Sequence, residues 1–155
     1  MILVVLLCLA DDSAWTTFSP KDGSFTARFP GTPSEKATRT GTLWQSSAKD
    51  RVYNVAKSAL SSGEGASPGE INAALDAVRD NIVKRVQAKL ITERKLLHDN
   101  LPAREFVYEL PEEKGLLRLR CLAVKGIVWE IKIGGPKEYV SGKEADTFIN
   151  SLKIK

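Results

Sequence analysis

The feature that most constrains the fold is a succession of four β-prone runs joined by links of only a few residues. The runs cover residues 91–97, 103–110, 116–124 and 127–133. The links between them, Asp99-Asn100-Leu101-Pro102, residues 111–115 and Lys125-Gly126, are rich in turn-forming residues. Links this short are typical of hairpins, so the second half of the chain predicts an antiparallel sheet.

The last of these hairpins has two candidate registers. A three-residue loop over residues 124–126 separates an apolar face from a charged one. The apolar set would be Leu119, Cys121, Trp129 and Ile131, and the charged set Arg118, Arg120, Glu130 and Lys132. A two-residue loop, Lys125-Gly126, mixes the two sets on each face. The polarity pattern therefore favours the three-residue loop.

One amphipathic helix, over about residues 68–90, precedes these runs. Ser67 and Glu70 form a capping box at its start, and Pro68 occupies the first helical position. Apolar residues recur at spacings of three and four: Ile71, Leu75, Val78, Ile82, Val86 and Leu90. The opposite face is charged, so we expect the helix to pack on the sheet through this stripe.

The segments before the helix are also β-prone. They cover residues 15–18, 24–29, 36–46 and 51–60. Aromatic residues of the first two segments recur at strand spacing: Trp15, Phe18, Phe25 and Phe29. This spacing favours a place in the core over an exposed aromatic platform.

A second capping box, Ser141 with Glu144, predicts a short C-terminal helix over about residues 142–150. Residues 151–155 can then add an edge strand. One long helix, one short helix and a mainly antiparallel sheet together predict an α+β fold.

The first ten residues resemble a secretory signal peptide. An apolar run, residues 2–7, leads to Cys8 and Ala10, which are small residues at the third-last and last positions before the expected cleavage site. A start site assigned too far downstream would explain why no Lys or Arg precedes the run. A buried first strand is disfavoured because Asp11-Asp12 follows with no turn residue. Lipidation of Cys8 is disfavoured because Leu7, which is not small, precedes it.

We therefore expect a signal peptide at residues 1–10, a single domain at residues 11–155, and a secreted or periplasmic location. The apolar run is far shorter than the roughly 20 residues that cross a bilayer, so no transmembrane span is expected. Cleavage would leave Cys121 as the only cysteine, which excludes an intramolecular disulfide. Because Cys121 lies in an apolar run, we expect a buried thiol rather than a nucleophile.

The charge distribution gives no support for nucleic-acid binding. The net charge is +4, and basic residues alternate with acidic ones, as in Arg79-Asp80. A nucleic-acid interface needs basic residues clustered on one face, with aromatic residues among them. No nucleic-acid partner is therefore expected.

Chemistry based on histidine would have to rest on His98, the only histidine of the chain. His98 stands beside Asp99 in a turn, and no carboxylate lies at a recognisable metal-ligand spacing from it. The Gly-x-Ser-x-Gly, Gly-x-Gly-x-x-Gly and phosphate-loop motifs are absent. We expect an exposed turn histidine, no catalytic residues, no metal and no cofactor.

The most suggestive charged pair is Arg104-Glu105, which begins a strand among apolar residues. Such an arginine can hold an anionic ligand in a pocket, which makes Arg104 and Glu105 candidate ligand-binding residues. The alternative, which we favour, is that Glu105 and Glu109 form cross-strand ion pairs with Arg118 or Arg120.

Several motifs together resemble a known superfamily. They are Trp15-x-x-Phe18, Asp22-Gly23-x-Phe25, Phe29-Pro30-Gly31-x-Pro33, Pro102-Ala103-Arg104-Glu105 and Ala145-Asp146-x-Phe148-x-x-Ser151. The chain is similar to small exported bacterial domains of unknown function that resemble the PsbP-like and DcrB-like superfamily. This resemblance covers nearly all of residues 11–155 and implies an α/β/α-type sandwich with a central antiparallel sheet. It transfers no functional residue.

Two functional hypotheses follow. The first is an exported, non-catalytic domain that docks to an envelope protein or binds a small ligand in a cleft beside the sheet. The second is an unrecognised hydrolase or metal-dependent enzyme centred on His98, Arg104 and Glu105, with Asp99 nearby. The second hypothesis requires these groups to converge in one pocket. The oligomeric state cannot be read from the sequence.

Overall fold

The computed structural model describes residues 15–155. The predictions for the signal peptide and for Cys8 therefore lie outside the described residues. The strands of the main sheet are β3 (Ser34–Ala37), β4 (Gly41–Ala48), β5 (Arg51–Ala59), β6 (Lys89–His98), β7 (Leu101–Glu109), β8 (Leu116–Val124) and β9 (Ile127–Gly135). They pair in the order β3-β4-β5-β9-β8-β7-β6, and every pairing is antiparallel.

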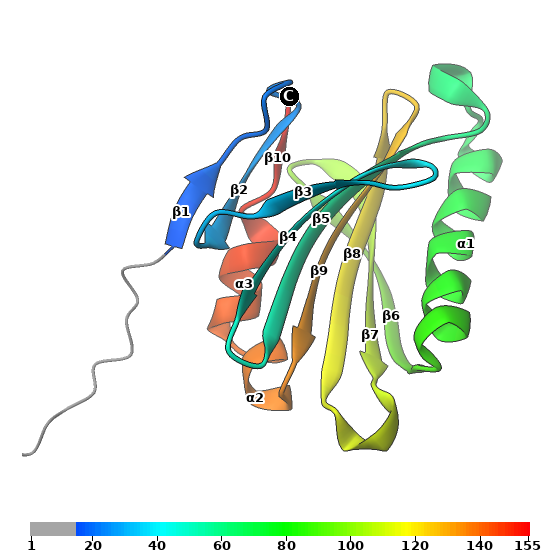
Figure 1. Ribbon diagram of the computed structural model, residues 1–155. Helices are drawn as coiled ribbons and strands as arrows, with labels where there is room; N and C mark the ends of the chain where they lie inside the picture. The colour runs from blue at the N-terminus through cyan, green and yellow to red at the C-terminus, as the bar shows by residue number, and fades with distance from the viewer. Residues whose placement is uncertain (1–14) are drawn as a thin grey trace, which may run out of the picture.

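Helices and a second, smaller sheet cover the two faces of this main sheet (Figure 1). Helix α1 (Pro68–Val86) packs on one face. The other face carries α2 (Lys137–Val140), α3 (Lys143–Asn150) and a small antiparallel sheet. The small sheet has the order β1-β2-β10, from β1 (Trp15–Phe18), β2 (Phe25–Pro30) and β10 (Lys153–Ile154). The result is the expected α+β fold, a three-layer sandwich around a mainly antiparallel sheet.

Two apolar cores separate the layers. The larger core lies between the main sheet and α3 with the small sheet, and its aromatic members are Phe25, Phe29, Trp44, Tyr53, Trp129 and Phe148. The smaller core lies under α1 and contains Leu75, Ile82, Phe106, Tyr108, Leu119 and Cys121. Because both faces of the sheet are buried, its central strands carry apolar residues on both sides.

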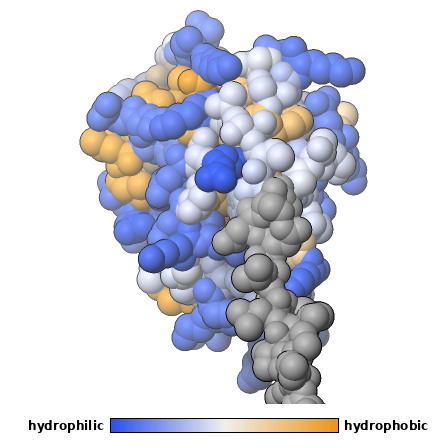
Figure 2. Space-filling model, turned by 90° about the vertical axis from the view of Figure 1, so that its left-hand side faces the viewer, coloured by the Kyte–Doolittle hydropathy of each residue, from blue (hydrophilic) through white to orange (hydrophobic). Residues whose placement is uncertain are grey.

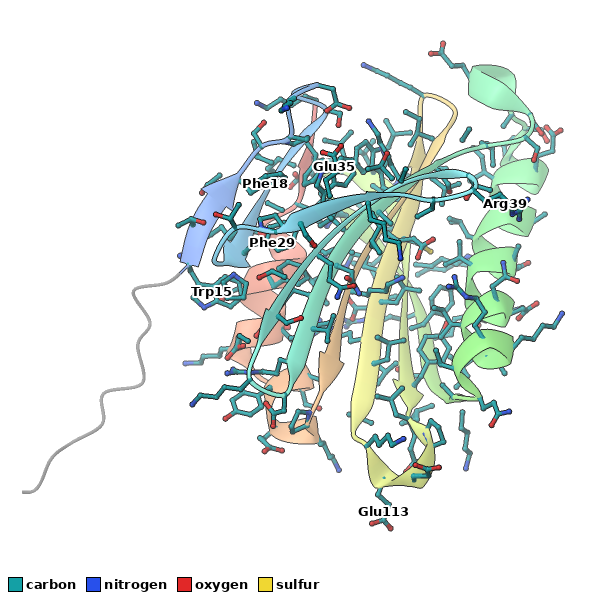
Figure 3. The ribbon with its side chains drawn as sticks, in the orientation of Figure 1. Trp15, Phe18, Phe29, Glu35, Arg39 and Glu113 are labelled. Atoms are coloured by element: carbon teal, nitrogen blue, oxygen red, sulfur yellow. The ribbon has the colours of Figure 1, made fainter. Side chains whose placement is uncertain are left out.

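The aromatic residues near the N-terminus belong to the larger core, as their spacing predicted. Phe25 and Phe29 are fully buried, and Trp15 and Phe18 pack against the same core at its edge (Figure 3). Phe29 and Tyr53 both contact the ring of Phe148 edge-on. Figure 2 shows the side of the molecule that carries β1, where hydrophilic residues predominate beside smaller hydrophobic areas.

Helix α1 is shorter than predicted. The capping box of Ser67 and Glu70 is present, but the helix ends at Val86, where Gln87 takes a left-handed conformation with φ of 53°. Leu90, expected in the helix, lies in β6 and packs against the same core as the helix does. The apolar spacing in the sequence continues past Val86 because α1 and β6 both contribute side chains to the core under α1. No described helix has the length and apolar character needed to cross a membrane.

The predicted strand at residues 36–46 is two strands, β3 and β4, joined by a hairpin. The hairpin closes where the backbone of Thr38 donates to Gly41 and the Gly41 backbone donates to the Thr38 hydroxyl. A Cβ atom at Gly41 would come within 1.9 Å of the Lys57 carbonyl oxygen, so the chain needs glycine there. The only sequence signal for this turn was one glycine.

The register predicted for the last hairpin was wrong. Val124 pairs with Ile127, so the loop has two residues, Lys125 and Gly126, both with positive φ. This is the backbone that two-residue hairpin turns require. The polarity argument failed because it assumed one solvated face. Both faces of β8 are covered, and Arg118 and Arg120 are buried.

The predicted capping box at Ser141 does not form. Ser141 ends α2, and Gly142 precedes α3 without a side-chain cap. The Glu144 carboxylate instead accepts hydrogen bonds from Arg51, at 2.7 Å, and from the Tyr53 hydroxyl. The helix itself is present close to its expected position, and β10 forms the expected edge strand.

Candidate functional site

A buried carboxylate surrounded by arginines lies on the sheet face that α3 covers. Glu105 on β7 stands directly between Arg94 on β6 and Arg120 on β8. Arg120 donates to Glu105 Oε2 from Nε at 2.9 Å and from Nη2 at 2.6 Å. Arg94 donates to Oε1 from Nε at 3.1 Å, and Arg118 Nε lies 3.1 Å from the same oxygen. We call Arg94, Arg118 and Arg120 the arginine cluster.

The arginine cluster keeps Glu105 ionised. The side chain of Glu105 is only 3% exposed, and burial by itself would raise its pKa. Hydrogen bonds from Arg120 and Arg94, and the charges of Arg118 and Arg120, outweigh this effect and lower the pKa below its ordinary value. Glu105 is therefore a fixed negative charge that holds three guanidinium groups together.

His98 and helix α3 complete this network on its inner side. Arg120 Nη1 donates to Asn150 Oδ1 at 2.8 Å and lies 3.1 Å from His98 Nδ1. His98 Nε2 lies 2.7 Å from the carbonyl oxygen of Leu152. Arginine can only donate and a carbonyl oxygen can only accept, so Nδ1 accepts and Nε2 carries the proton.

The expectation of an exposed His98 was therefore wrong, since the residue is 4% exposed. Strand β6 continues through His98, and the turn consists of Asp99 and Asn100 alone, both with positive φ. The His98 side chain consequently points from the strand into the layer below α3 rather than into solvent.

The outer side of the arginine cluster borders a hollow of about 450 Å³. Its lining residues are Thr92, Arg94, Glu105, Val107, Arg118, Val140, Ser141 and Asp146. The Arg94 side chain is 61% exposed, whereas that of Arg118 is 11% exposed. Arg118 Nη1 also contacts Asp146 Oδ1 at 2.7 Å, and the Asp146 side chain is 53% exposed. The hollow thus presents the guanidinium group of Arg94 and the hydroxyl groups of Thr92 and Ser141 to solvent.

The structure separates Arg104 from Glu105. Adjacent residues of a strand point to opposite faces, so Arg104 lies under α1. There it contacts Asp76, donates to Asn72 Oδ1 at 2.9 Å, and lies 3.4 Å from Glu93 Oε1. These contacts tie α1 to the sheet. A single small ligand cannot contact both candidate residues.

The favoured cross-strand pairing is confirmed for Glu105 with Arg118 and Arg120. Glu109 was expected to take part and does not pair with these arginines in the register. It lies opposite Leu116 on β8 and Lys89 on β6. Arg94 and Asp146 also belong to the site, and no motif or spacing in the sequence singled them out as site residues.

The residues of the enzyme hypothesis do not converge. Both ring nitrogens of His98 have partners, Arg104 lies on the other face, and Asp99 pairs with Lys153 at 2.6 Å. Within residues 15–155, no three His, Cys, Asp or Glu side chains are close enough to hold a metal ion. Cys121 is fully buried as expected, and burial raises the pKa of its thiol to about 12.

Comparison with solved structures identifies the fold. The structure is similar to cyanobacterial PsbP (CyanoP) from Synechocystis sp. PCC 6803, with a TM-score of 0.67 and 10% identity over 92% of this chain and 93% of that one. A protein of unknown function from Pseudomonas aeruginosa gives a TM-score of 0.50 and 13% identity, over 85% and 90% of the two chains. No protein-family model and no curated protein matches the sequence. At these identities the likeness concerns the fold alone, and it confirms the PsbP-like fold that the motifs suggested.

Proposed function

We propose that this protein is an exported, non-catalytic domain that binds a small anion in the hollow beside the arginine cluster. One observation carries the proposal. Among residues 15–155, three guanidinium groups converge where only two carboxylates, those of Glu105 and Asp146, lie close to them. An anion that enters the hollow would balance this positive charge.

The hollow contains donors suited to a carboxylate or a phosphate. Arg94 uses Nε and Nη2 on Glu105, so its Nη1 amino group has no partner within residues 15–155, and the side chain lines the hollow. Thr92 and Ser141 supply hydroxyl groups at the rim. Guanidinium groups bind planar and tetrahedral oxyanions through paired hydrogen bonds, which are stronger than neutral ones. Val107 and Val140 add apolar contacts beside the charges.

Citrate titration, followed by calorimetry and thermal shift, tests this proposal. Citrate should raise the melting temperature more than sodium chloride of equal ionic strength does. Arg94→Ala should abolish the difference, because its guanidinium is the accessible one. Lys95→Ala is the matched control, since Lys95 is the next residue of β6 and points to the other face.

Two results would refute anion binding at this hollow. One is an equal effect of citrate and chloride at matched ionic strength. The other is a citrate response that survives Arg94→Ala, or that is lost equally in Lys95→Ala.

The proposal includes export through a signal peptide at residues 1–10, followed by one PsbP-like domain at residues 11–155. It is supported by the apolar run and the small residues before Asp11. Intact-mass measurement of the protein from its native host should give an N-terminus at Asp11. A cytoplasmic product that retains Met1 would contradict export. An envelope protein as partner stays a prediction, which a pull-down from the envelope fraction would test.

A further inference from the structure

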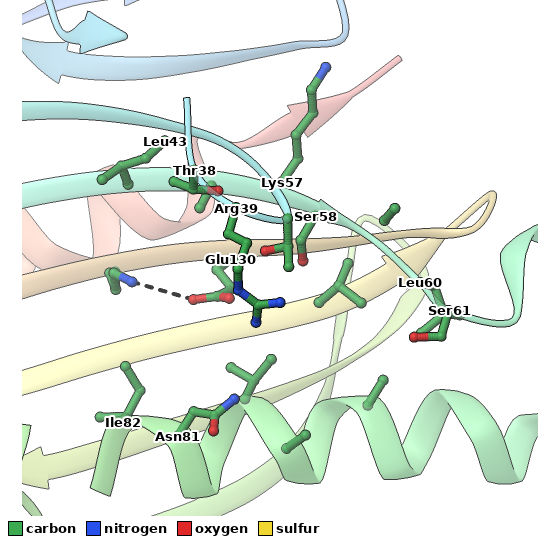
Figure 4. Close-up of a pocket in the computed structure, with 18 of the residues that line it drawn as sticks. Thr38, Arg39, Leu43, Lys57, Ser58, Leu60, Ser61, Asn81, Ile82 and Glu130 are labelled. Carbon is green, nitrogen blue, oxygen red and sulfur yellow. Dashed lines mark hydrogen bonds and ion pairs between the residues drawn. The ribbon is translucent and has the colours of Figure 1, made fainter. Parts of the chain in front are cut away.

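A second cavity lies on the opposite face of the sheet from the arginine cluster. It is a groove of about 740 Å³ between α1 and the strands β4, β5 and β9 (Figure 4). Helix α1 packs mainly over β7 and β8, and leaves this part of the sheet uncovered. Small residues on both walls keep the groove open: Ala56, Ser58, Ala59, Ala74 and Ala77.

The interior of the groove has an apolar part beside a polar part of similar extent. Leu43 and Val128 contribute from the sheet, and Val78 and Ile82 from α1. The charges on the groove floor are Glu130 and Lys132, and they compensate each other through a contact of 3.4 Å. A ligand that lies along this floor would therefore meet apolar contacts and one neutral ion pair.

Uncompensated positive charge lies at the groove's open side. Arg39 stands at the tip of the β3–β4 hairpin, which extends toward α1 (Figure 3). Figure 4 shows its side chain reaching down between the sheet and α1, toward Asn81 and Ile82. Arg85 lines the same groove from α1. Within residues 15–155, neither arginine takes part in an ion pair.

We propose that this groove binds a small amphipathic anion. The apolar body of the ligand lies between α1 and β9, against Val78 and Val128. Its carboxylate or phosphate group is held by Arg39 and Arg85. The volume is within the range of about 300–1,000 Å³ typical of small-molecule sites, and the lining offers both apolar and polar groups, as an amphipathic ligand requires. This site is independent of the hollow beside the arginine cluster, because the sheet separates the two.

Decanoate at concentrations below micelle formation is a suitable probe, measured by calorimetry. Decanoate and decyl phosphate should bind, whereas acetate lacks the apolar body and decyltrimethylammonium has the wrong charge. The ratio of decanoate to decyl phosphate affinity identifies the preferred head group. Equal binding of the cationic amphiphile would overturn the proposal, as would binding to anionic vesicles without any binding of free decanoate.

Two pairs of variants locate the site. Arg39→Ala should weaken decanoate binding about tenfold or more, as expected for loss of a hydrogen bond to a charged group. Ala77→Phe should block the groove. The controls are Lys84→Ala and Ala73→Phe, which change exposed residues of α1 that do not line the groove.

Arg94→Ala separates this proposal from anion binding at the arginine cluster. It should leave decanoate affinity unchanged, because Arg94 lies on the other face of the sheet. Decanoate binding that is lost in Arg94→Ala but kept in Arg39→Ala and Ala77→Phe would refute the groove and assign the ligand to the hollow.

Discussion

At the scale of single residues, the charge of Glu105 allows three arginine side chains to lie close together. Arg118 and Arg120 are buried, and each would carry a large desolvation cost without a counter-charge. Glu105 accepts from both and from Arg94, so one carboxylate organises strands β6, β7 and β8. The pair of Arg120 and Glu105 is also the link through which His98 and Asn150 join the network.

Replacing Glu105 by glutamine should destabilise the protein by about 3–5 kcal/mol, because Arg120 is left buried without its counter-charge and Arg118 keeps only its contact with the half-exposed Asp146. The loss should depend on pH. The pKa of Glu105 is lowered on folding, so its stabilising effect is present above the ordinary value of 4.5 and is lost as the pH falls below it. Urea denaturation at neutral and acidic pH measures both effects.

The control for this prediction is Glu109→Gln, which removes an exposed carboxylate from the same strand. Its effect on the free energy of unfolding should stay within about 0.5 kcal/mol. A Glu105→Gln variant no less stable than the Glu109→Gln variant would show that the arginines do not need the buried charge.

At the scale of elements, α1 is fixed by its apolar side and by the ion pairs of Arg104. Leu75→Ala should lower the free energy of unfolding by about 2–5 kcal/mol, because Leu75 is 4% exposed in the core under the helix. Lys84→Ala, on the exposed side, should change it by less than about 0.5 kcal/mol. Equal and small losses in thermal or urea denaturation would contradict the packing of α1.

The elements were predictable where local sequence determines them. Ser67 and Glu70 fix the start of α1 through contacts three residues apart, and the strand spacing of Phe25 and Phe29 indicated a buried face. The capping box at Ser141 failed because Glu144 has stronger distant partners, Arg51 and Tyr53. Sequence spacing does not report such contacts between elements far apart in the chain.

The candidate site was predictable only in part, for a related reason. Glu105, Arg118 and Arg120 were recognised because they lie on consecutive β-prone runs. Arg94 was missed because the two-residue turn at Asp99 and Asn100 was not recognised, and that turn sets Arg94 opposite Glu105. Arg104 and Glu105 were named together as candidates for one site, although adjacent residues of a strand point to opposite faces. The covering of both faces, which buries the arginines, depends on α3 and on the C-terminal segment.

At the scale of the whole molecule, the C-terminal residues close the larger core. Leu152 is fully buried there, its carbonyl oxygen contacts His98, and β10 pairs with β2. Deletion of residues 152–155 should lower the melting temperature and should speed amide hydrogen exchange in β2 much more than in β8. Lys155→Ala is the control, because it keeps these contacts. Unchanged exchange in β2 after the deletion would show that β10 does not stabilise the small sheet.

The pairing of β10 with β2 also has a consequence for biosynthesis. Translation produces Phe25 and Thr26 early, yet their strand partners Lys153 and Ile154 emerge from the ribosome only after residues 27–152. Until then the larger core lacks Phe148, Ile149 and Leu152, and the nascent polypeptide cannot complete its native packing. The larger core therefore stays incomplete until synthesis ends. Under the export proposed above, this delay would keep the larger core open until the chain has left the cytoplasm.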